Sequence, residues 1–185
     1  MNTPDTSDTA EKVATAARAI ADALKHASPG DLAAMRRMRD GAGAPLFWRL
    51  AARHADIDHR PDAWIPIARM MALLTPTGQP EARAPLHDPK RPLGAVLCDG
   101  GDAGWNAPAP MLSEKRLARL LATRGKARRV ALERALRMLA NRRPPGPLVN
   151  VVEVAWAVLN PKGGHIARDY YARLDRAANQ SKEEA

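Results

Sequence analysis

A chain of 185 residues is long enough for one domain, or for two small lobes that share a core. Apolar residues make up 45% and charged residues 26%, and no apolar run approaches the ~18 residues that a transmembrane helix needs. A transmembrane helix is therefore excluded, and collagen-like, coiled-coil and fully disordered chains fit this composition poorly. The polar, acidic start lacks the pattern of a signal peptide, and the single Cys98 allows no internal disulfide, so we expect a cytoplasmic protein.

The spacing of apolar residues predicts an all-α protein, a compact bundle of about seven to eight helices that could form two lobes. Residues 8–26 form the first expected helix, and Ser28 with Asp31 resembles a capping box that starts a second helix of about ten residues. Further helices are expected near 45–55 and over 61–74, 114–123, 126–141, 148–159 and 164–178. Strand-like alternation is confined to residues 149–152, where it is ambiguous.

Residues 76–111 differ from the rest of the chain, because seven Pro and five Gly fall within these 36 positions. Regular structure should be scarce here, and a tolerated surface insertion is the alternative to a functional or mobile connection. The apolar run 93–97 and Trp105 could anchor the segment to the core. We therefore divide the chain into an N-terminal helical lobe (1–75), a Pro/Gly-rich connection (76–111) and a basic C-terminal helical lobe (112–180), which together could form one compact unit.

The positive charge of the chain is concentrated in one segment, called here the basic segment (113–143). It contains eleven Lys and Arg but only Glu114 and Glu133 as acids, so it carries +9, which equals the net charge of the whole chain. Clustered positive charge is typical of proteins that bind a polyanion, and a merely solvated helix face is the alternative. A GC-rich genome would explain the preference for Arg over Lys, but it would not explain why Asp and Glu are scarce in the basic segment.

Helical periodicity separates the cations of the basic segment from its apolar residues. Leu117, Leu120 and Leu121 of helix 114–123 should point inward, as should an apolar stripe of helix 126–141, which leaves cations on the outside of both. Guanidinium groups bind phosphate oxygens without reading bases, and the segment has no aromatic residue to stack on bases, which favours sequence-independent backbone contacts. The predicted nucleic-acid-binding residues are Arg36, Arg37, Lys115, Arg116, Arg119, Lys126, Arg129, Arg134, Arg137, Arg142 and Arg143.

Some of the arginines have a second interpretation. Arg36 and Arg37 belong to a smaller cluster with Arg39 on the second helix, where a solvated helix face is the alternative to nucleic-acid contact. Arg128 falls near the apolar stripe of its own helix. We expect it either to pair with a carboxylate or to mark the start of the helix.

No arrangement of residues indicates catalysis, a metal or a cofactor. Two His and two Asp gather within residues 54–59, but no second cluster completes a metal cage, so a polar loop is expected there. Cys98 and His87 are close in sequence without forming a recognisable nucleophile pair, and the glycines within 100–104 neither follow a strand nor open a helix. We therefore predict a protein that is not an enzyme and that holds no cofactor or metal.

Three short stretches of the chain carry a family resemblance. Residues 112–121 contain the series Ser-x-x-Arg-Leu-x-Arg-Leu-Leu, residues 35–37 read Met-Arg-Arg, and residues 167–171 read Ala-Arg-Asp-Tyr-Tyr. In this order and spacing they resemble the small, CasB-type subunit of the type I-E CRISPR Cascade complex, over roughly residues 30–175. The chain departs from the family at Ile166, where the family has Trp, at 147–150, which lack its Asp-Trp pair, and in the Pro/Gly-rich insertion.

The resemblance implies a non-enzymatic helical subunit of an RNA-guided surveillance complex, commonly present in more than one copy. Such subunits contact the repeating backbone subunits and the large subunit, stabilise the guide–target hybrid and hold the displaced DNA strand. The expected partners are therefore guide RNA, target DNA, the other Cascade subunits and a second copy in head-to-tail contact, with no membrane involved. The basic segment fits this role, because guide–target pairing supplies specificity and the protein need only hold backbone.

Two other functions would also use the basic segment. A helix-turn-helix regulator would exploit the short connection between helices 114–123 and 126–141 and would prefer one duplex sequence. A scaffold subunit would instead dock an acidic protein on the same face. Sequence-specific duplex binding distinguishes the first alternative, and binding that survives nuclease treatment distinguishes the second.

Overall fold

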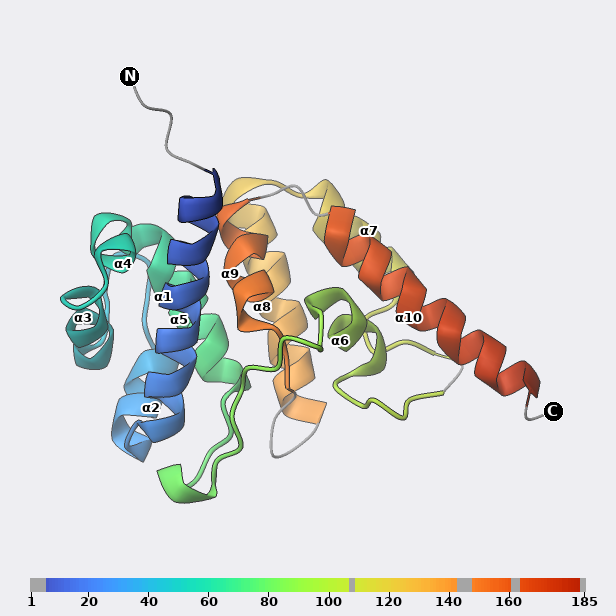
Figure 1. Cartoon of the computed structure of the whole chain (residues 1–185), viewed down its shortest axis with the longest axis horizontal. Coiled ribbons are helices and arrows are strands. Elements are labelled where there is room, and N and C mark those ends of the chain that lie inside the picture. Colours follow the sequence, from blue (N-terminus) through green and yellow to red (C-terminus); the bar gives the residue numbers. More distant parts are fainter. Residues whose placement is uncertain (1–5, 107–108, 143–147, 161–163, 184–185) are drawn as a thin grey trace.

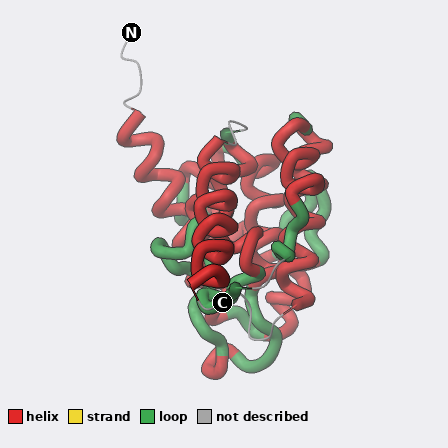
Figure 2. Tube along the Cα trace, turned by 90° about the vertical axis from the view of Figure 1, so that its right-hand side faces the viewer, coloured by secondary structure: helices red, strands yellow, loops and turns green. Residues whose placement is uncertain are grey.

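The computed structural model describes residues 6–106, 109–142, 148–160 and 164–183. Within these ranges it is helical and has no strand, which confirms the predicted all-α fold (Figure 2). It has ten α-helices and one short 3₁₀ helix, more than the seven to eight helices expected. The α-helices are α1 (Thr6–His26), α2 (Pro29–Arg36), α3 (Pro45–Ala51), α4 (Ala55–His59), α5 (Pro61–Leu74), α6 (Leu93–Asp99), α7 (Glu114–Ala122), α8 (Gly125–Arg142), α9 (Val151–Leu159) and α10 (Gly164–Glu183), and the 3₁₀ helix is η1 (Pro80–Ala82). None of the described helices is both long and apolar enough to cross a membrane.

The helices lie in three groups, with α1 to α5 at one end, α8 and α9 in the middle, and α6, α7 and α10 at the other end (Figure 1). α1 packs on α5 and α9, α5 packs on α8 and α9, and α6 packs along α10. α8 also contacts α7, and it contributes a buried leucine stripe (Leu132, Leu136 and Leu139) to the core. Buried side chains from all three groups belong to one hydrophobic core, in which Trp64 and Tyr170 are the largest fully buried residues.

Local sequence signals start several helices where the sequence predicts them. The Ser28 hydroxyl accepts a hydrogen bond from the amide of Asp31 at 3.0 Å, and Pro29 follows it as the first residue of α2. α5 matches the predicted range 61–74 at both ends and also begins with a proline. The serine cap and proline of α2, and the proline and dense apolar pattern of α5, are local signals that suffice to place these helices.

Residues 54–59, expected as a polar loop, contain the short helix α4. Ile57 is fully buried and anchors this turn to the core. The Asp56 carboxylate accepts hydrogen bonds from Arg60 at 2.5 Å and from the indole of Trp64 at 3.2 Å. The polar residues therefore fix α4 to the start of α5, and the described residues contain no group of three or more His, Cys, Asp or Glu arranged to hold a metal.

A buried arginine holds the first half of the Pro/Gly-rich connection. Arg83 is 4% exposed, and its guanidinium donates hydrogen bonds of 2.6–3.2 Å to three carbonyls at the end of α1, those of Leu24, Lys25 and Ala27. The last carbonyls of a helix lack partners within the helix, and the helix dipole favours a cation there. A further bond of 2.6 Å to the carbonyl of Gly78 fixes the connection to α1.

The second half of the connection contains α6, which the sequence pattern does not predict. The whole helix is buried and packs mainly against α10. Because no face meets solvent, the sequence shows no amphipathic period, and a run of this length is too short to reveal one. The run 93–97 does anchor the connection to the core, as expected, and Trp105 packs at the edge of that core. A surface insertion is therefore the wrong interpretation for residues 93–99.

Gly94 allows α6 and α10 to approach closely. A Cβ atom at this position would overlap with the carbonyl oxygen of Ile166 and would lie 2.8 Å from the amide nitrogen of Tyr170, both on α10. A glycine is therefore required at this crossing. Tyr170 is fully buried, and its hydroxyl donates a hydrogen bond of 2.5 Å to the carbonyl of Leu112, which fixes the chain just before α7.

A buried carboxylate ties the end of α6 to α10. The Asp99 side chain is 0% exposed and accepts hydrogen bonds of 2.9 Å from both Arg91 and Arg173. Arg173 also donates to the carbonyls of Ala103 and Trp105, and its guanidinium lies 5.2 Å from the centre of the Trp105 ring. Because two cations compensate the buried charge, the interaction holds the turn after α6 in place.

We expect Gly94→Ala to lower the free energy of unfolding by about 1–3 kcal/mol or more, because the added methyl group forces α6 away from α10. Urea unfolding followed by circular dichroism measures the change. Gly30→Ala is the matched control, since a Cβ there would lie 3.8 Å from the Ser28 hydroxyl, an ordinary contact. Equal stability of the two variants would show that the helix crossing tolerates a side chain.

Glu153 of α9 caps the start of α6. Its carboxylate accepts hydrogen bonds from the Leu93 amide at 2.7 Å and from the side-chain amide of Asn150 at 3.2 Å. Burial raises the pKa of Glu153, and the bond from Leu93 offsets this only in part. The folded state therefore holds this proton more tightly than the unfolded chain, so ionisation of Glu153 opposes folding as the pH rises through the ordinary glutamate pKa of about 4.3.

We expect Glu153→Gln to remove this unfavourable ionisation. Glutamine keeps an oxygen for the Leu93 amide, so the free energy of unfolding at pH 7 should equal or exceed that of the unchanged protein, and the difference should shrink below about pH 4. Urea unfolding at several pH values measures it. Glu81→Gln, at an exposed position, controls for the loss of one negative charge. A loss of stability at pH 7 in Glu153→Gln alone would contradict the expectation.

Candidate nucleic-acid interface

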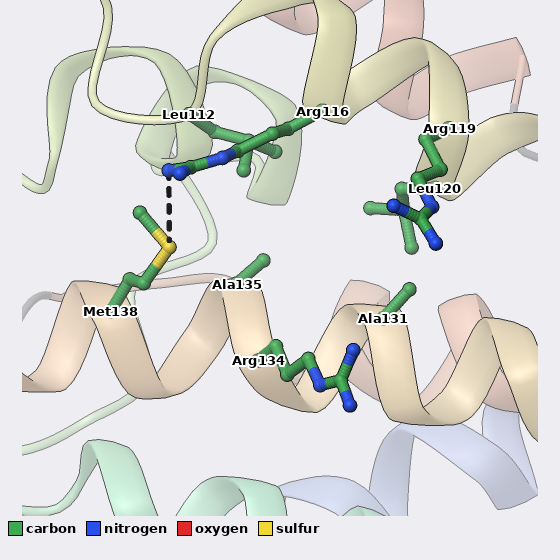
Figure 3. Close-up of a pocket in the computed structure, with 8 residues that line it drawn as sticks. All are labelled: Leu112, Arg116, Arg119, Leu120, Ala131, Arg134, Ala135 and Met138. Atoms are coloured by element: carbon green, nitrogen blue, oxygen red, sulfur yellow. Dashed lines mark hydrogen bonds between the residues drawn. The ribbon is translucent and has the colours of Figure 1, made fainter.

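A groove between α7 and α8 collects cations from both helices (Figure 3). Its volume is about 280 Å³. Three exposed arginines line it, Arg116 and Arg119 from α7 and Arg134 from α8. The other lining residues are apolar, namely Leu112, Leu120, Ala131, Ala135 and Met138. The groove therefore offers positive charge at its edges above an apolar floor.

The buried faces of the two helices explain why these arginines meet. On α7, Leu117 and Leu120 are 1% and 2% exposed, and side chains one position away from them flank the buried face. Arg116 and Arg119 occupy two of those flanking positions. On α8, the leucine stripe faces the core, Ala131, Ala135 and Met138 face α7, and Arg134 borders the groove from its solvent side. The sequence prediction that both helices present cations together therefore holds for these three residues.

The groove arginines have few competing partners. No carboxylate of the described residues pairs with any of the three, whereas other cations of α8 are paired. Arg116 donates from Nη1 to Sδ of Met138 at 3.7 Å, and a thioether is a weak acceptor. Figure 3 shows Arg119 and Arg134 on either side of one end of the groove, with Arg116 and Met138 at the other end. Exposed guanidinium groups without a carboxylate partner can donate paired hydrogen bonds to phosphate oxygens.

Two predicted cations of α8 already have carboxylate partners. Lys126 lies 3.9 Å from Asp40, and Arg137 lies 2.9 Å from Glu133. The two cations remain 78% and 54% exposed, so water and salt weaken both pairs. The two carboxylates, Asp40 and Glu133, still lower the net positive charge that this part of α8 presents to a polyanion.

Glu133 anchors α8 to the N-terminal helices. Its carboxylate is 16% exposed and accepts a hydrogen bond of 2.6 Å from Arg69 of α5, in addition to the bond from Arg137. Arg69 is 17% exposed and also donates to the carbonyl of Met38 at 2.9 Å. This acid of the basic segment therefore has a structural role, because it fixes the rotation of α8 and with it the direction of Arg134.

Arg36 serves the fold rather than the groove. It donates hydrogen bonds to the carbonyls of Ala72 at 2.8 Å and Thr75 at 2.5 Å, so it caps the end of α5. Burial lowers the pKa of Arg36, and the neighbouring Arg83 lowers it further. Arg37 is exposed just after α2, which Figure 1 places far from α7. Neither residue lines the groove.

The remaining predicted residues either lie on α7 and α8 without lining the groove or fall outside the described part. Lys115 is exposed on α7, and Arg129 is half-buried on α8, and neither lines the groove. The side chain of Arg142 and the whole of Arg143 lie outside the described residues. The structure thus brings together three of the eleven predicted residues in one groove.

Arg128 is buried in the first turn of α8, with 4% of its surface exposed. Within the described ranges, neither Nη1 nor Nη2 has a hydrogen-bond partner. Burial lowers the pKa of Arg128, and the adjacent Arg124 lowers it further. The prediction of a carboxylate partner is therefore wrong for the described residues, whereas the position agrees with the other prediction, that Arg128 marks the start of the helix.

Two residues of the groove floor, Met138 and Leu112, were not predicted, whereas Leu120, Ala131 and Ala135 belong to the predicted apolar faces. Met138 lies four residues after Arg134 and seven after Ala131, so helical spacing is the signal that could have found it. Leu112 precedes α7, and no periodicity points to it. Leu121, expected to point inward, is only half-buried. The charged edges were therefore easier to predict than the apolar surface between them.

Comparison of the chain with protein-family models, with curated proteins and with solved structures finds no match. No relative therefore assigns a family, a ligand or a partner to this chain.

We expect Glu133→Gln to lower the free energy of unfolding by about 1–3 kcal/mol, because Arg69, in a mostly buried place, loses its nearest carboxylate and keeps only the exposed Asp40 at 3.8 Å. Urea unfolding measures the loss. Glu81→Gln removes an acid at an exposed position outside the basic segment and should change stability by less than about 0.5 kcal/mol. If both variants are as stable as the unchanged protein, the pair does not anchor α8.

Proposed function

We propose that this protein is a non-catalytic nucleic-acid-binding subunit of an RNA-guided CRISPR surveillance complex, equivalent to the small subunit of type I-E Cascade. It holds sugar–phosphate backbone in the groove between α7 and α8. The observation that carries the proposal is that Arg116, Arg119 and Arg134 come from two helices to line one groove, without carboxylate partners among the described residues.

The chemistry of the groove favours backbone over base recognition. Guanidinium groups donate paired hydrogen bonds to phosphate oxygens, which are the same at every nucleotide. The basic segment has no aromatic side chain on which a series of bases could stack. Binding should therefore be independent of sequence and strongly dependent on salt, because each neutralised phosphate releases counterions. In a guided complex, pairing between guide and target supplies the specificity.

The sequence resemblance supports the same assignment. Both arginines in the family series Ser-x-x-Arg-(Phe/Leu)-x-Arg-Leu-Leu correspond to residues of the groove, Arg116 and Arg119. The proposed partners are guide RNA and target DNA, as single strands or as a hybrid, the other Cascade subunits, and a second copy in head-to-tail contact. The proposed location is the cytoplasm, and the role requires no cofactor.

We expect replacement of Arg116, Arg119 and Arg134 by Ala to weaken binding of mixed-sequence single-stranded DNA roughly 10- to 100-fold at low salt. The slope of log affinity against log salt should fall by about two, because each contact with a single strand contributes about 0.7. Fluorescence anisotropy across a salt series measures both. A triple Ala variant of Arg18, Arg53 and Arg176, which are exposed and lie outside the groove, removes the same charge.

The control decides between a specific groove and a general effect of charge. If both triple variants lose affinity equally, net charge alone governs binding and the groove is not the site. A strong preference for one duplex sequence over random duplex would favour a helix-turn-helix regulator instead. Membership of the surveillance complex is tested separately, by co-purification of the chain with a short guide RNA from its native host, and the absence of that RNA would contradict it.

A further inference from the structure

One methionine differs from the others in its surroundings. Among the methionines of the described part, five are buried with at most 6% of their surface exposed, namely Met35, Met38, Met70, Met71 and Met111. Met138 is only half-buried, and it lines the groove between α7 and α8. Among the described methionines, Met138 is therefore the one that an oxidant dissolved in water reaches most readily.

The sulfur of Met138 lies directly against a groove arginine. Its Sδ accepts the hydrogen bond from Nη1 of Arg116 at 3.7 Å, and Figure 3 shows the two side chains reaching toward one another from α8 and α7. Because the thioether is a weak acceptor, Arg116 can exchange this contact for a phosphate oxygen at little loss. The chemical state of the sulfur therefore determines how available Arg116 is.

We propose that Met138 is an oxidation site that controls polyanion binding in the groove. A hydroperoxide transfers one oxygen atom to the thioether: the sulfur–oxygen bond forms as the peroxide oxygen–oxygen bond breaks. The sulfur loses two electrons to the peroxide, and hydrogen peroxide leaves as water. The product is methionine sulfoxide, which methionine sulfoxide reductases return to the thioether.

The sulfoxide oxygen is a strong acceptor, whereas the thioether sulfur is a weak one. When directed toward Arg116 it lies within reach of the guanidinium, because the sulfur itself is already 3.7 Å from Nη1. It then competes with phosphate for the same N–H groups and places a dipole on the apolar floor. Oxidation should therefore weaken polyanion binding, a consequence that rests on the proposed function of the groove.

The thiol of Cys98, the single cysteine of the chain, does not compete with Met138 for the oxidant. Cys98 is fully buried in α6. Burial raises the pKa of the Cys98 thiol to about 12, and the neighbouring Asp99 carboxylate contributes to this, so the reactive thiolate is scarce at neutral pH. Mild peroxide treatment should thus modify the groove before it modifies the core.

Peptide mass mapping after limited treatment with hydrogen peroxide tests the site itself. We expect oxygen addition at Met138 at least tenfold faster than at the five buried methionines, because access controls the rate. Comparable rates at Met138 and at any buried methionine, in protein that circular dichroism shows to be folded, would overturn the assignment of the site. This measurement does not depend on nucleic-acid binding.

Binding of labelled single-stranded DNA tests the consequence. Oxidised protein should bind about three- to tenfold more weakly than untreated protein, with a salt slope lower by up to about 0.7, and sulfoxide reductase should restore both. Met138→Leu, which keeps the volume and cannot be oxidised, should bind equally before and after peroxide. Met138→Gln, which offers a permanent oxygen acceptor, should bind weakly without peroxide.

The outcomes separate this inference from the proposed function. Tight binding by the untreated protein, with no change on oxidation or an equal loss in Met138→Leu, overturns the control by Met138 and leaves the groove intact as a binding site. Failure of the untreated protein to bind overturns the proposed function and the control together, while mass mapping still decides whether Met138 is the preferred oxidation site.

Discussion

The burial of the leucine stripe of α8 decides where the cations of this helix lie. Successive helical residues advance by about 100°, so once the stripe packs on the core, the direction of every other side chain on α8 follows. Ala131, Ala135 and Met138 then face α7, Arg134 lies at the outer edge of the groove, and Lys126 and Arg137 point to solvent. The Glu133–Arg69 pair fixes the same rotation by charge. Apolar packing and electrostatics agree, so the groove depends on the core as much as on its arginines.

The other wall of the groove depends on the Pro/Gly-rich connection. The amides of Met111 and Leu112 donate hydrogen bonds to the carbonyls of Cys98 at 2.7 Å and Leu97 at 3.0 Å, so the end of α6 holds the start of α7. α6 is in turn fixed on α10 by the glycine crossing and by the buried carboxylate of Asp99. A segment that has the composition of a linker therefore places one side of the candidate binding site.

The helices that could be predicted from sequence are those whose own residues carry both a start signal and a long apolar pattern. α5 has a proline at its start and a dense apolar pattern, and its bounds match the prediction at both ends. α6 and α4 were missed for a physical reason: each is short, and contacts with distant parts of the chain, rather than its own pattern, hold it in place. Gly94 even lowers the helix propensity of α6, because its value appears only where α10 crosses it.

The candidate site could likewise be predicted only in part. The sequence shows where the arginines are, but it does not show which of them stabilise the fold and which face the groove. Arg83 and Arg36 donate to carbonyls at helix ends, Arg173 compensates a buried acid, and Arg116 faces an open groove, yet all four are arginines in helical or near-helical sequence. A guanidinium has five donors and suits all these tasks, so composition cannot separate them.

This division of roles means that the net charge of +9 overstates the charge that a polyanion meets. Cations such as Arg137, which is already paired, must share or exchange their partner before they contact a phosphate, and the charge of the partner remains nearby. Counterion release depends on the phosphates actually neutralised rather than on the formal charge of the chain. The salt dependence of binding therefore reports on the unpaired arginines of the groove, which is why variants of equal charge at different places are informative.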